Sequence, residues 1–188
     1  MATLALSEIQ NTTGEVVDRY GNPIQSGVRY YIVPAGSNSG GGGFTVINFN
    51  NTCPLNVGQQ SNYQGLGLPV TIQPYTGTSY VTENTDSTLT FSISTVCGQS
   101  ARWMVGQTDP ISGRRLIMAG SGYGSGNYTY YFQIVGTQFR GTYYIQWCPT
   151  DVCPYCNLDC SFVGTMVLNG MLLAALDGNA LPVQFQRA

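Results

Sequence analysis

Short runs of apolar or alternating residues recur along the whole chain, and this pattern constrains the fold more than any other feature. Each run has the length of a strand and is separated from the next by glycine, proline or asparagine. One of them, residues 88–93, alternates with period two, which is typical of a half-buried strand. No window carries a helical stripe with capping residues. The runs lie at residues 28–33, 44–49, 68–72, 88–93, 102–105, 115–118, 128–134, 142–147, 163–168, 171–176 and 181–185.

About twelve strands at a spacing of roughly 10–15 residues predict an all-β domain, either a sandwich or a barrel. A length of 188 residues is enough for one domain with a substantial core. Residues 34–43 are too rich in glycine for a strand. They lack the lysine and the following helix of a phosphate-binding loop, so we expect a flexible connector there.

The composition excludes several kinds of chemistry. There is no histidine and no lysine, which removes the usual general base, the commonest metal ligand and the Schiff-base nucleophile. The nine acidic residues stand in turn-like settings such as residues 84–87 and 177–179, where we expect solvated side chains. We therefore predict a protein that is not an enzyme and that needs no cofactor and no metal.

Charge and hydropathy also limit the partners. The net charge is −2, and the seven arginines are scattered along the chain, so we expect no nucleic-acid partner. No apolar run approaches the roughly 20 residues of a membrane span, and we expect no membrane partner. Three glycosylation triplets, together with six cysteines, favour the secretory pathway. The triplets begin at Asn11, Asn50 and Asn127.

Four cysteines are crowded into the segment CPTDVCPYCNLDC, from Cys148 to Cys160. A redox-active dithiol needs its CPYC motif at the start of a helix that follows a strand, and no helix is predicted here. A four-cysteine zinc site needs two short pairs separated by a longer loop. Both interpretations are disfavoured, which leaves a stapled loop. Six cysteines allow fifteen disulfide pairings, and the residues alone do not choose among them.

Several motifs in order resemble one family. VDRYGNPI begins at Val17, GVRYYIVPA at Gly27, CPLNV at Cys53, ARW at Ala101 and LPVQF at Leu181. Together they closely resemble the plant Kunitz proteins of the soybean trypsin inhibitor type, from about residue 16 to residue 186. The four-cysteine segment is most similar to the miraculin-like branch, although one extra residue, Asp151, stands between its first two cysteines.

The resemblance implies a disulfide-stapled β-trefoil of twelve strands in three repeats. It places a single domain at residues 16–188, behind an N-terminal extension, residues 1–15, that we expect to be poorly ordered. It also implies a protein that is secreted or vacuolar and that binds a protease through an exposed loop. The sequence does not fix the oligomeric state, and we favour a monomer. Three disulfide bonds follow from the resemblance: Cys53–Cys97, Cys148–Cys160 and Cys153–Cys156.

In this family the inhibitory loop follows Cys53 by some twenty residues, which places it at residues 73–79. The loop contains Gln73, Pro74, Tyr75, Thr76, Gly77, Thr78 and Ser79. By position, Thr76 would enter the S1 pocket of a protease, and Ser26 would support the loop. Threonine leaves the buried carboxylate of a trypsin pocket unpaired, and Gly77 loosens a loop that should be stiff. We therefore expect weak inhibition of trypsin, or none.

Alternatives remain open at this point. The loop would suit an elastase-like or subtilisin-like pocket, or a chymotrypsin-like pocket if Tyr75 were presented instead. Arg114 and Arg115 are expected to be exposed on a hairpin tip and could present an arginine to a trypsin-like pocket. The turn at residues 138–141, which contains Arg140, could do the same. Tyr155 is a candidate contact residue between two cysteines. Relatives of this fold also inhibit cysteine proteases or α-amylases, bind small ligands such as chlorophyll, or serve in storage and defence, because a fold does not fix a function.

Overall fold

The computed structural model describes residues 14–36, 40–49, 51–120 and 126–188. Within these residues the chain forms thirteen strands and one short 3₁₀ helix. The first seven strands are β1 (Arg29–Pro34), β2 (Phe44–Ile47), β3 (Leu55–Gln59), β4 (Val70–Pro74), β5 (Ser87–Ser94), β6 (Ser100–Thr108) and β7 (Arg115–Ala119). After the helix η1 (Asn127–Tyr130) come β8 (Gln133–Gly136), β9 (Tyr143–Trp147), β10 (Ser161–Phe162), β11 (Gly164–Leu168), β12 (Met171–Ala175) and β13 (Val183–Arg187).

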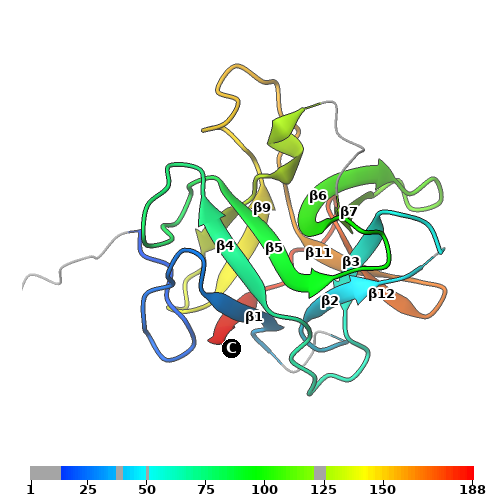
Figure 1. Ribbon diagram of the computed structural model, residues 1–188, viewed down its shortest axis with the longest axis horizontal. Helices are drawn as coiled ribbons and strands as arrows, with labels where there is room; N and C mark the ends of the chain where they lie inside the picture. Colours follow the sequence, from blue (N-terminus) through cyan, green and yellow to red (C-terminus); the bar gives the residue numbers. More distant parts are fainter. Residues whose placement is uncertain (1–13, 37–39, 50, 121–125) are drawn as a thin grey trace, which may run out of the picture.

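Six of the strands form a closed barrel. β1 pairs with β13 and β4, β4 pairs with β5, and β9 pairs with β8 and β13. The remaining gap, between β5 and β8, is closed by a bridge between Ser87 and Phe132. In Figure 1 the barrel strands β1, β4, β5 and β9 lie near the centre of the view, to the left of β3 and β12.

Three antiparallel hairpins, β2–β3, β6–β7 and β11–β12, cover one end of this barrel. One strand from each hairpin also pairs with the other two, because β3, β7 and β12 are joined to one another. This triangle of hairpins on a six-stranded barrel gives the molecule its pseudo-threefold symmetry. The fold is therefore a β-trefoil, as predicted, and the cap lies on the right of Figure 1.

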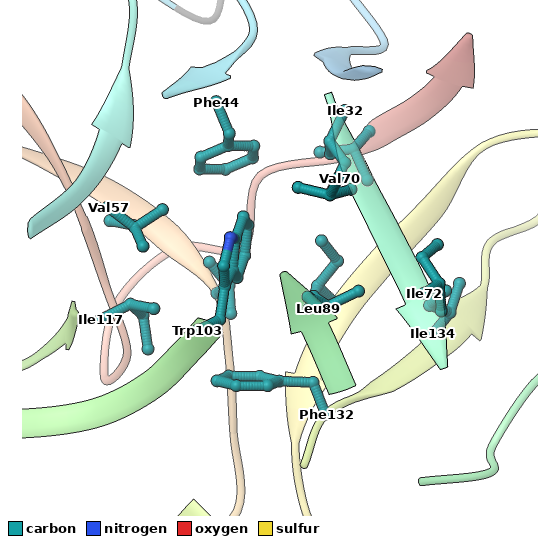
Figure 2. Packing of buried hydrophobic residues seen from close by; sticks show 14 of the residues in the cluster. Ile32, Phe44, Val57, Val70, Ile72, Leu89, Trp103, Ile117, Phe132 and Ile134 are labelled. Carbon is teal, nitrogen blue, oxygen red and sulfur yellow. The ribbon is translucent and has the colours of Figure 1, made fainter. Parts of the chain in front are cut away.

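Trp103, from β6, lies at the centre of the core and is fully buried. Its ring contacts Phe44 at 5.2 Å, Phe91 at 5.7 Å and Phe132 at 6.1 Å between ring centroids. Figure 2 shows Trp103 between the rings of Phe44 and Phe132, with aliphatic side chains on both sides. Edge-on aromatic packing of this kind adds stability to that gained from burying apolar area, and here it joins the cap to the barrel.

Three expectations about elements need correction. The run at 128–134 is not one strand, because η1 occupies its first half and β8 begins only at Gln133. Two strands were missed. β10 is only two residues long. β3 is buried along its whole length although Asn56 and Gln59 are polar, so its sequence contains no continuous apolar run. The described part of the glycine-rich segment also packs tightly, since a Cβ at Gly43 would lie 1.9 Å from the Leu66 carbonyl oxygen.

Most of the expected N-terminal extension, residues 1–13, lies outside the described residues, which begin at residue 14. Glu15 already pairs with Thr82, so contacts with the domain start before residue 16. No helix in the described residues is long and apolar enough to cross a membrane.

Candidate protease-binding loop

The 73–79 loop begins where β4 and β5 separate. Gln73 and Pro74 still belong to β4, and Pro74 pairs with Ser87 at the start of β5. The chain then leaves the barrel wall, and residues 75–80 are exposed. The Tyr75 N–H donates to the Asp86 carbonyl oxygen at 2.8 Å, which closes the base of the loop. The loop therefore stands out from the barrel on a firm base (Figure 1, the green segment after β4).

The tip of the loop is a tight turn. The Gly77 N–H donates to the Pro74 carbonyl oxygen at 3.0 Å, and Gly77 has a φ of 72°, in the region that favours glycine. Thr76 is exposed at this turn, as a residue that enters a pocket must be. A peptide that pairs its main chain with a partner is extended, however, whereas this tip reverses direction. Opening the turn would cost part of the binding free energy.

The segment at residues 24–27 supports one side of the loop. The Ser26 N–H donates to the Ser79 carbonyl oxygen at 2.9 Å, and the Ser26 hydroxyl donates to Gln73 Oε1 at 3.1 Å. The neighbouring Gln25 pairs with Tyr80 in a bridge. Ser26 thus contacts both ends of the 73–79 loop, in the place where the resemblance expects a supporting side chain.

The other side of the loop is held by Asp86, and here an expectation was wrong. Residues 84–87 were expected to form a solvated turn, but Asp86 is only 1% exposed. Its carboxylate accepts from Gln133 Nε2 at 2.8 Å and from the N–H groups of Asp151 and Val152 at 2.9 Å each. Burial raises the pKa of Asp86, and the nearby Asp151 charge raises it further, while these hydrogen bonds oppose the shift.

Sequence reasoning missed Asp86, Gln133 and Tyr131 as parts of this site. Tyr131 packs edge-on against Tyr75, with ring centroids 5.5 Å apart. None of the three carries a local signal, because their partners come from other strands and turns. The one available signal was Asp151, which stands as an extra residue between Cys148 and Cys153.

The expectation of two exposed arginines at 114 and 115 is wrong. Arg114 folds back onto the cap, where its guanidinium donates to the carbonyl oxygens of Leu176, Ala175 and Thr165 at 2.8, 3.2 and 3.3 Å. Arg115 forms an ion pair with Asp177 at 2.7 Å, and its side chain is only 19% exposed. A guanidinium has five donors in a planar fork, which lets one side chain bond several carbonyl groups at the end of a hairpin. Neither arginine is displayed to a partner.

The other candidate surfaces differ in exposure. Arg140 remains exposed in the turn between β8 and β9. The cysteine knuckle, residues 148–160, is closed by the Cys148–Cys160 disulfide and contains the Cys153–Cys156 disulfide. Tyr155 is 97% exposed within it. The third disulfide, Cys53–Cys97, encloses the 73–79 loop, so the three bonds are those that the resemblance implied.

Two further expectations concern modification and metals. Asn127 is exposed at the start of η1, whereas Asn11 and Asn50 lie outside the described residues. Among the residues that the structure describes, no group of three or more potential metal ligands comes together.

Comparison with known proteins agrees with this architecture. The model of a family of trypsin and protease inhibitors, the Kunitz legume type, matches residues 16–187. Kunitz type trypsin inhibitor 104 of Medicago truncatula is 43% identical over 190 residues, covering 100% of this chain and 91% of that protein. Kunitz type trypsin inhibitor 106 of the same plant is 41% identical and covers 92% of this chain and 86% of its own length.

Solved structures share the fold. The Kunitz-type cysteine protease inhibitor PCPI-3 from potato superposes with a TM-score of 0.77 at 26% identity, covering 94% of this chain and 98% of that chain. Soybean trypsin inhibitor superposes with a TM-score of 0.74 at 24% identity, covering 93% and 99%. The family that matches is one of protease inhibitors and not of enzymes. The chain therefore belongs to the plant Kunitz family of trypsin and protease inhibitors.

Proposed function

We propose that this protein inhibits a serine protease by inserting the 73–79 loop into the active-site cleft, with Thr76 directed at the S1 pocket. The observation that carries the proposal is the loop itself, which is exposed at its tip and held at both flanks. A loop whose ends are held loses little conformational entropy on binding. Its cleaved ends would also stay in place, because Ser26, Asp86 and the Cys53–Cys97 disulfide hold them.

The side chain at position 76 sets the class of target. Threonine is small and uncharged, so it fits a shallow or permissive pocket such as that of an elastase-like or subtilisin-like protease. A trypsin pocket has a buried carboxylate that requires arginine or lysine, and an unpaired buried charge is costly. The protein is therefore a poor inhibitor of trypsin, although the relatives named above carry trypsin in their names.

The test exchanges the side chain at position 76. We expect the wild-type protein to inhibit elastase or subtilisin more strongly than trypsin, in a panel that also contains chymotrypsin, papain and an α-amylase. Thr76→Arg should improve the inhibition constant for trypsin by about 100-fold or more, because it supplies the missing cation to a buried carboxylate. The measurement is a set of steady-state inhibition constants.

Arg140→Ala is the matched control, because Arg140 is exposed in another turn that could present arginine to trypsin. Removing it should leave all constants unchanged. Wild-type trypsin inhibition that is lost in Arg140→Ala, but not altered at position 76, would contradict the proposal. So would a wild-type protein that inhibits no member of the panel.

A further inference from the structure

Asp86 uses every polar group it has, and it does so at the base of the 73–79 loop. Its carbonyl oxygen accepts from Tyr75 on the loop side. Its N–H donates to Asp151 Oδ2 at 2.9 Å, and in return the Asp151 N–H donates to Asp86 Oδ2 at 2.9 Å. Asp86 Oδ1 accepts from Gln133 Nε2. One buried residue therefore connects the loop, the barrel strand β8 and the cysteine knuckle.

Because of the position of Asp86, these bonds help to fix where the loop leaves the barrel. The pairing of β4 with β5 ends at Pro74 and Ser87, so the Tyr75–Asp86 bond is the last main-chain link before the loop departs. If the main chain at Asp86 shifts, Tyr75 shifts with it, at the point where the loop leaves β4. Ser26 and Gln25 bond Gln73, Ser79 and Tyr80 instead, so they do not replace the link at Tyr75.

The cysteine knuckle provides a rigid anchor for Asp86. Asp151 lies between Cys148 and Cys153, inside the Cys148–Cys160 ring. Two main-chain bonds shape the same turn, from the Thr150 N–H to the Cys148 carbonyl oxygen at 2.8 Å and from the Cys153 N–H to the Pro149 carbonyl oxygen at 3.0 Å. The Asp151 and Val152 N–H groups of this turn donate to the Asp86 carboxylate. Hydrogen bonds to an ionised group are stronger than neutral ones, so a rigid turn that makes two of them holds Asp86 firmly.

The two carboxylates lie close together, which is unfavourable unless something compensates for it. The Gln133 amide and the N–H groups of Asp151 and Val152 supply that compensation at Asp86. Apolar side chains would serve simple burial better. The feature that sets this pair apart is the reciprocal bonding of Asp86 and Asp151 between the loop base and the knuckle.

We propose that Asp86 and Asp151 form a brace that positions the 73–79 loop for protease binding, with the cysteine knuckle as its anchor. Both are positioning residues, because they act on the protease only through the loop. The inference rests on the proposed function, and it assigns to the knuckle a role as the loop's second support. The knuckle's disulfides would then preserve inhibitory strength as well as the fold of their own segment.

The brace has a chemical asymmetry that makes it testable. Asp151 uses a single side-chain oxygen, Oδ2, to accept from the Asp86 N–H, and an asparagine can place its amide oxygen there. Asp86 uses both side-chain oxygens, so Asp86→Asn would turn an NH₂ group toward a donor. Asp151→Asn should therefore preserve the brace, whereas Asp151→Ala and Asp86→Asn should break it.

The experiment compares Asp151→Ala, Asp151→Asn and the control Asp159→Ala, which removes another exposed carboxylate from the same knuckle. For the protease that the wild type inhibits best, we expect Asp151→Ala to raise the inhibition constant about tenfold. Asp151→Asn and Asp159→Ala should stay within about twofold of the wild type. Hydrogen exchange of the Tyr75 and Asp86 amides should accelerate in Asp151→Ala alone, by more than the accompanying fall in global stability accounts for.

The outcomes separate the two proposals. If the wild type inhibits no protease, the proposed function fails, and amide exchange still decides whether the brace exists. Equal effects of Asp151→Ala and Asp151→Asn would overturn the brace, and so would unchanged exchange in Asp151→Ala. If Asp151→Ala does not fold, Gln133→Leu removes a donor to the same carboxylate from β8. It should then reproduce the faster exchange, and its failure to do so would also overturn the brace.

Discussion

The 73–79 loop and the arginine turn, residues 109–115, both follow a strand and both look exposed in the sequence. In the 73–79 loop the flanks are bonded, Thr76 is exposed, and Tyr75 is half exposed beside Tyr131, so the loop can meet a partner. In the arginine turn the charged side chains fold back and bond the cap. A charge at a hairpin tip therefore does not indicate a binding surface when carbonyl groups of neighbouring strands lie within its reach.

Both turns are closed by a glycine N–H. The Gly113 N–H donates to the Asp109 carbonyl oxygen, four residues back, at 2.8 Å, and the Gly77 N–H donates to the Pro74 carbonyl oxygen, three residues back, at 3.0 Å. Gly113 has a φ of 73° and Gly77 a φ of 72°. The side chains beside the two glycines also differ, since Arg114 is long and has several donors, whereas Thr76 and Thr78 are short. Only the arginine side chain reaches back to the cap, and this separates the structural turn from the candidate functional one.

Removing Arg114 should have the largest effect on stability. Arg114→Ala leaves three carbonyl groups without their donor, and we expect a loss of about 2–4 kcal/mol in the free energy of unfolding. Thr76→Ala should change it by less than about 0.5 kcal/mol, because Thr76 is an exposed side chain. Urea unfolding of both variants measures this. An Arg114→Ala variant as stable as the wild type would break the comparison.

The two glycines offer a closely matched pair of smaller changes. A Cβ at Gly77 or at Gly113 meets nothing within 4 Å, so alanine adds only backbone strain at each position. Both Gly77→Ala and Gly113→Ala should cost about 1 kcal/mol of stability.

Inhibition should separate these two variants. Suppose that the protease binds the tip in an extended form, so that the turn closed by the Gly77 N–H must open. Gly77→Ala destabilises that turn and should lower the inhibition constant by about fivefold, since about 1 kcal/mol corresponds to that factor. Gly113→Ala should leave the inhibition constant unchanged. Equal inhibition constants for the two variants would show that the tip does not change shape on binding.

Much of the fold could be predicted from local pattern, and much of the site could not. The alternation of residues 88–93 identifies β5 because burial of one face repeats every second residue. β3 was not predicted because two of its buried residues, Asn56 and Gln59, are polar. Their burial depends on hydrogen bonds to other segments, such as that from Gln59 Nε2 to the Gly42 carbonyl oxygen. A hydrophobicity pattern does not detect polar residues of this kind as part of a buried strand.

The same reason explains the errors at the candidate site. Asp86 looks like a turn residue in its own neighbourhood, and its partner Asp151 lies 65 residues away. Arg114 looks solvated until the carbonyl groups of residues 165, 175 and 176 are brought beside it. Thr76 and Ser26 could be located because a family resemblance fixes their register. No property of their own side chains identifies them.

The pKa values of one carboxyl group in each region should be shifted in opposite directions from the ordinary value. This is the smallest effect that we expect. The Arg115 guanidinium, bonded to Asp177, lowers the pKa of Asp177 below its ordinary 3.8, so its contribution to stability is present above pH 3.8 and is lost as the pH falls through the folded value. Burial raises the pKa of Asp86 above 3.8, so its contribution is present below pH 3.8 and is lost as the pH rises through the folded value.

An NMR titration of the carboxyl carbons tests both directions in one sample. The Asp177 midpoint should lie below 3.8 and the Asp86 midpoint above it. In Asp177→Asn, stability at neutral pH should fall by about 0.5–1 kcal/mol, as for a partly exposed ion pair, and the difference from the wild type should shrink as the pH drops below 3.8. An Asp177 midpoint above that of Asp86 would contradict both assignments. It would mean that the ion pair with Arg115 does not stabilise the Asp177 carboxylate, and so does not hold the Arg115 side chain in place.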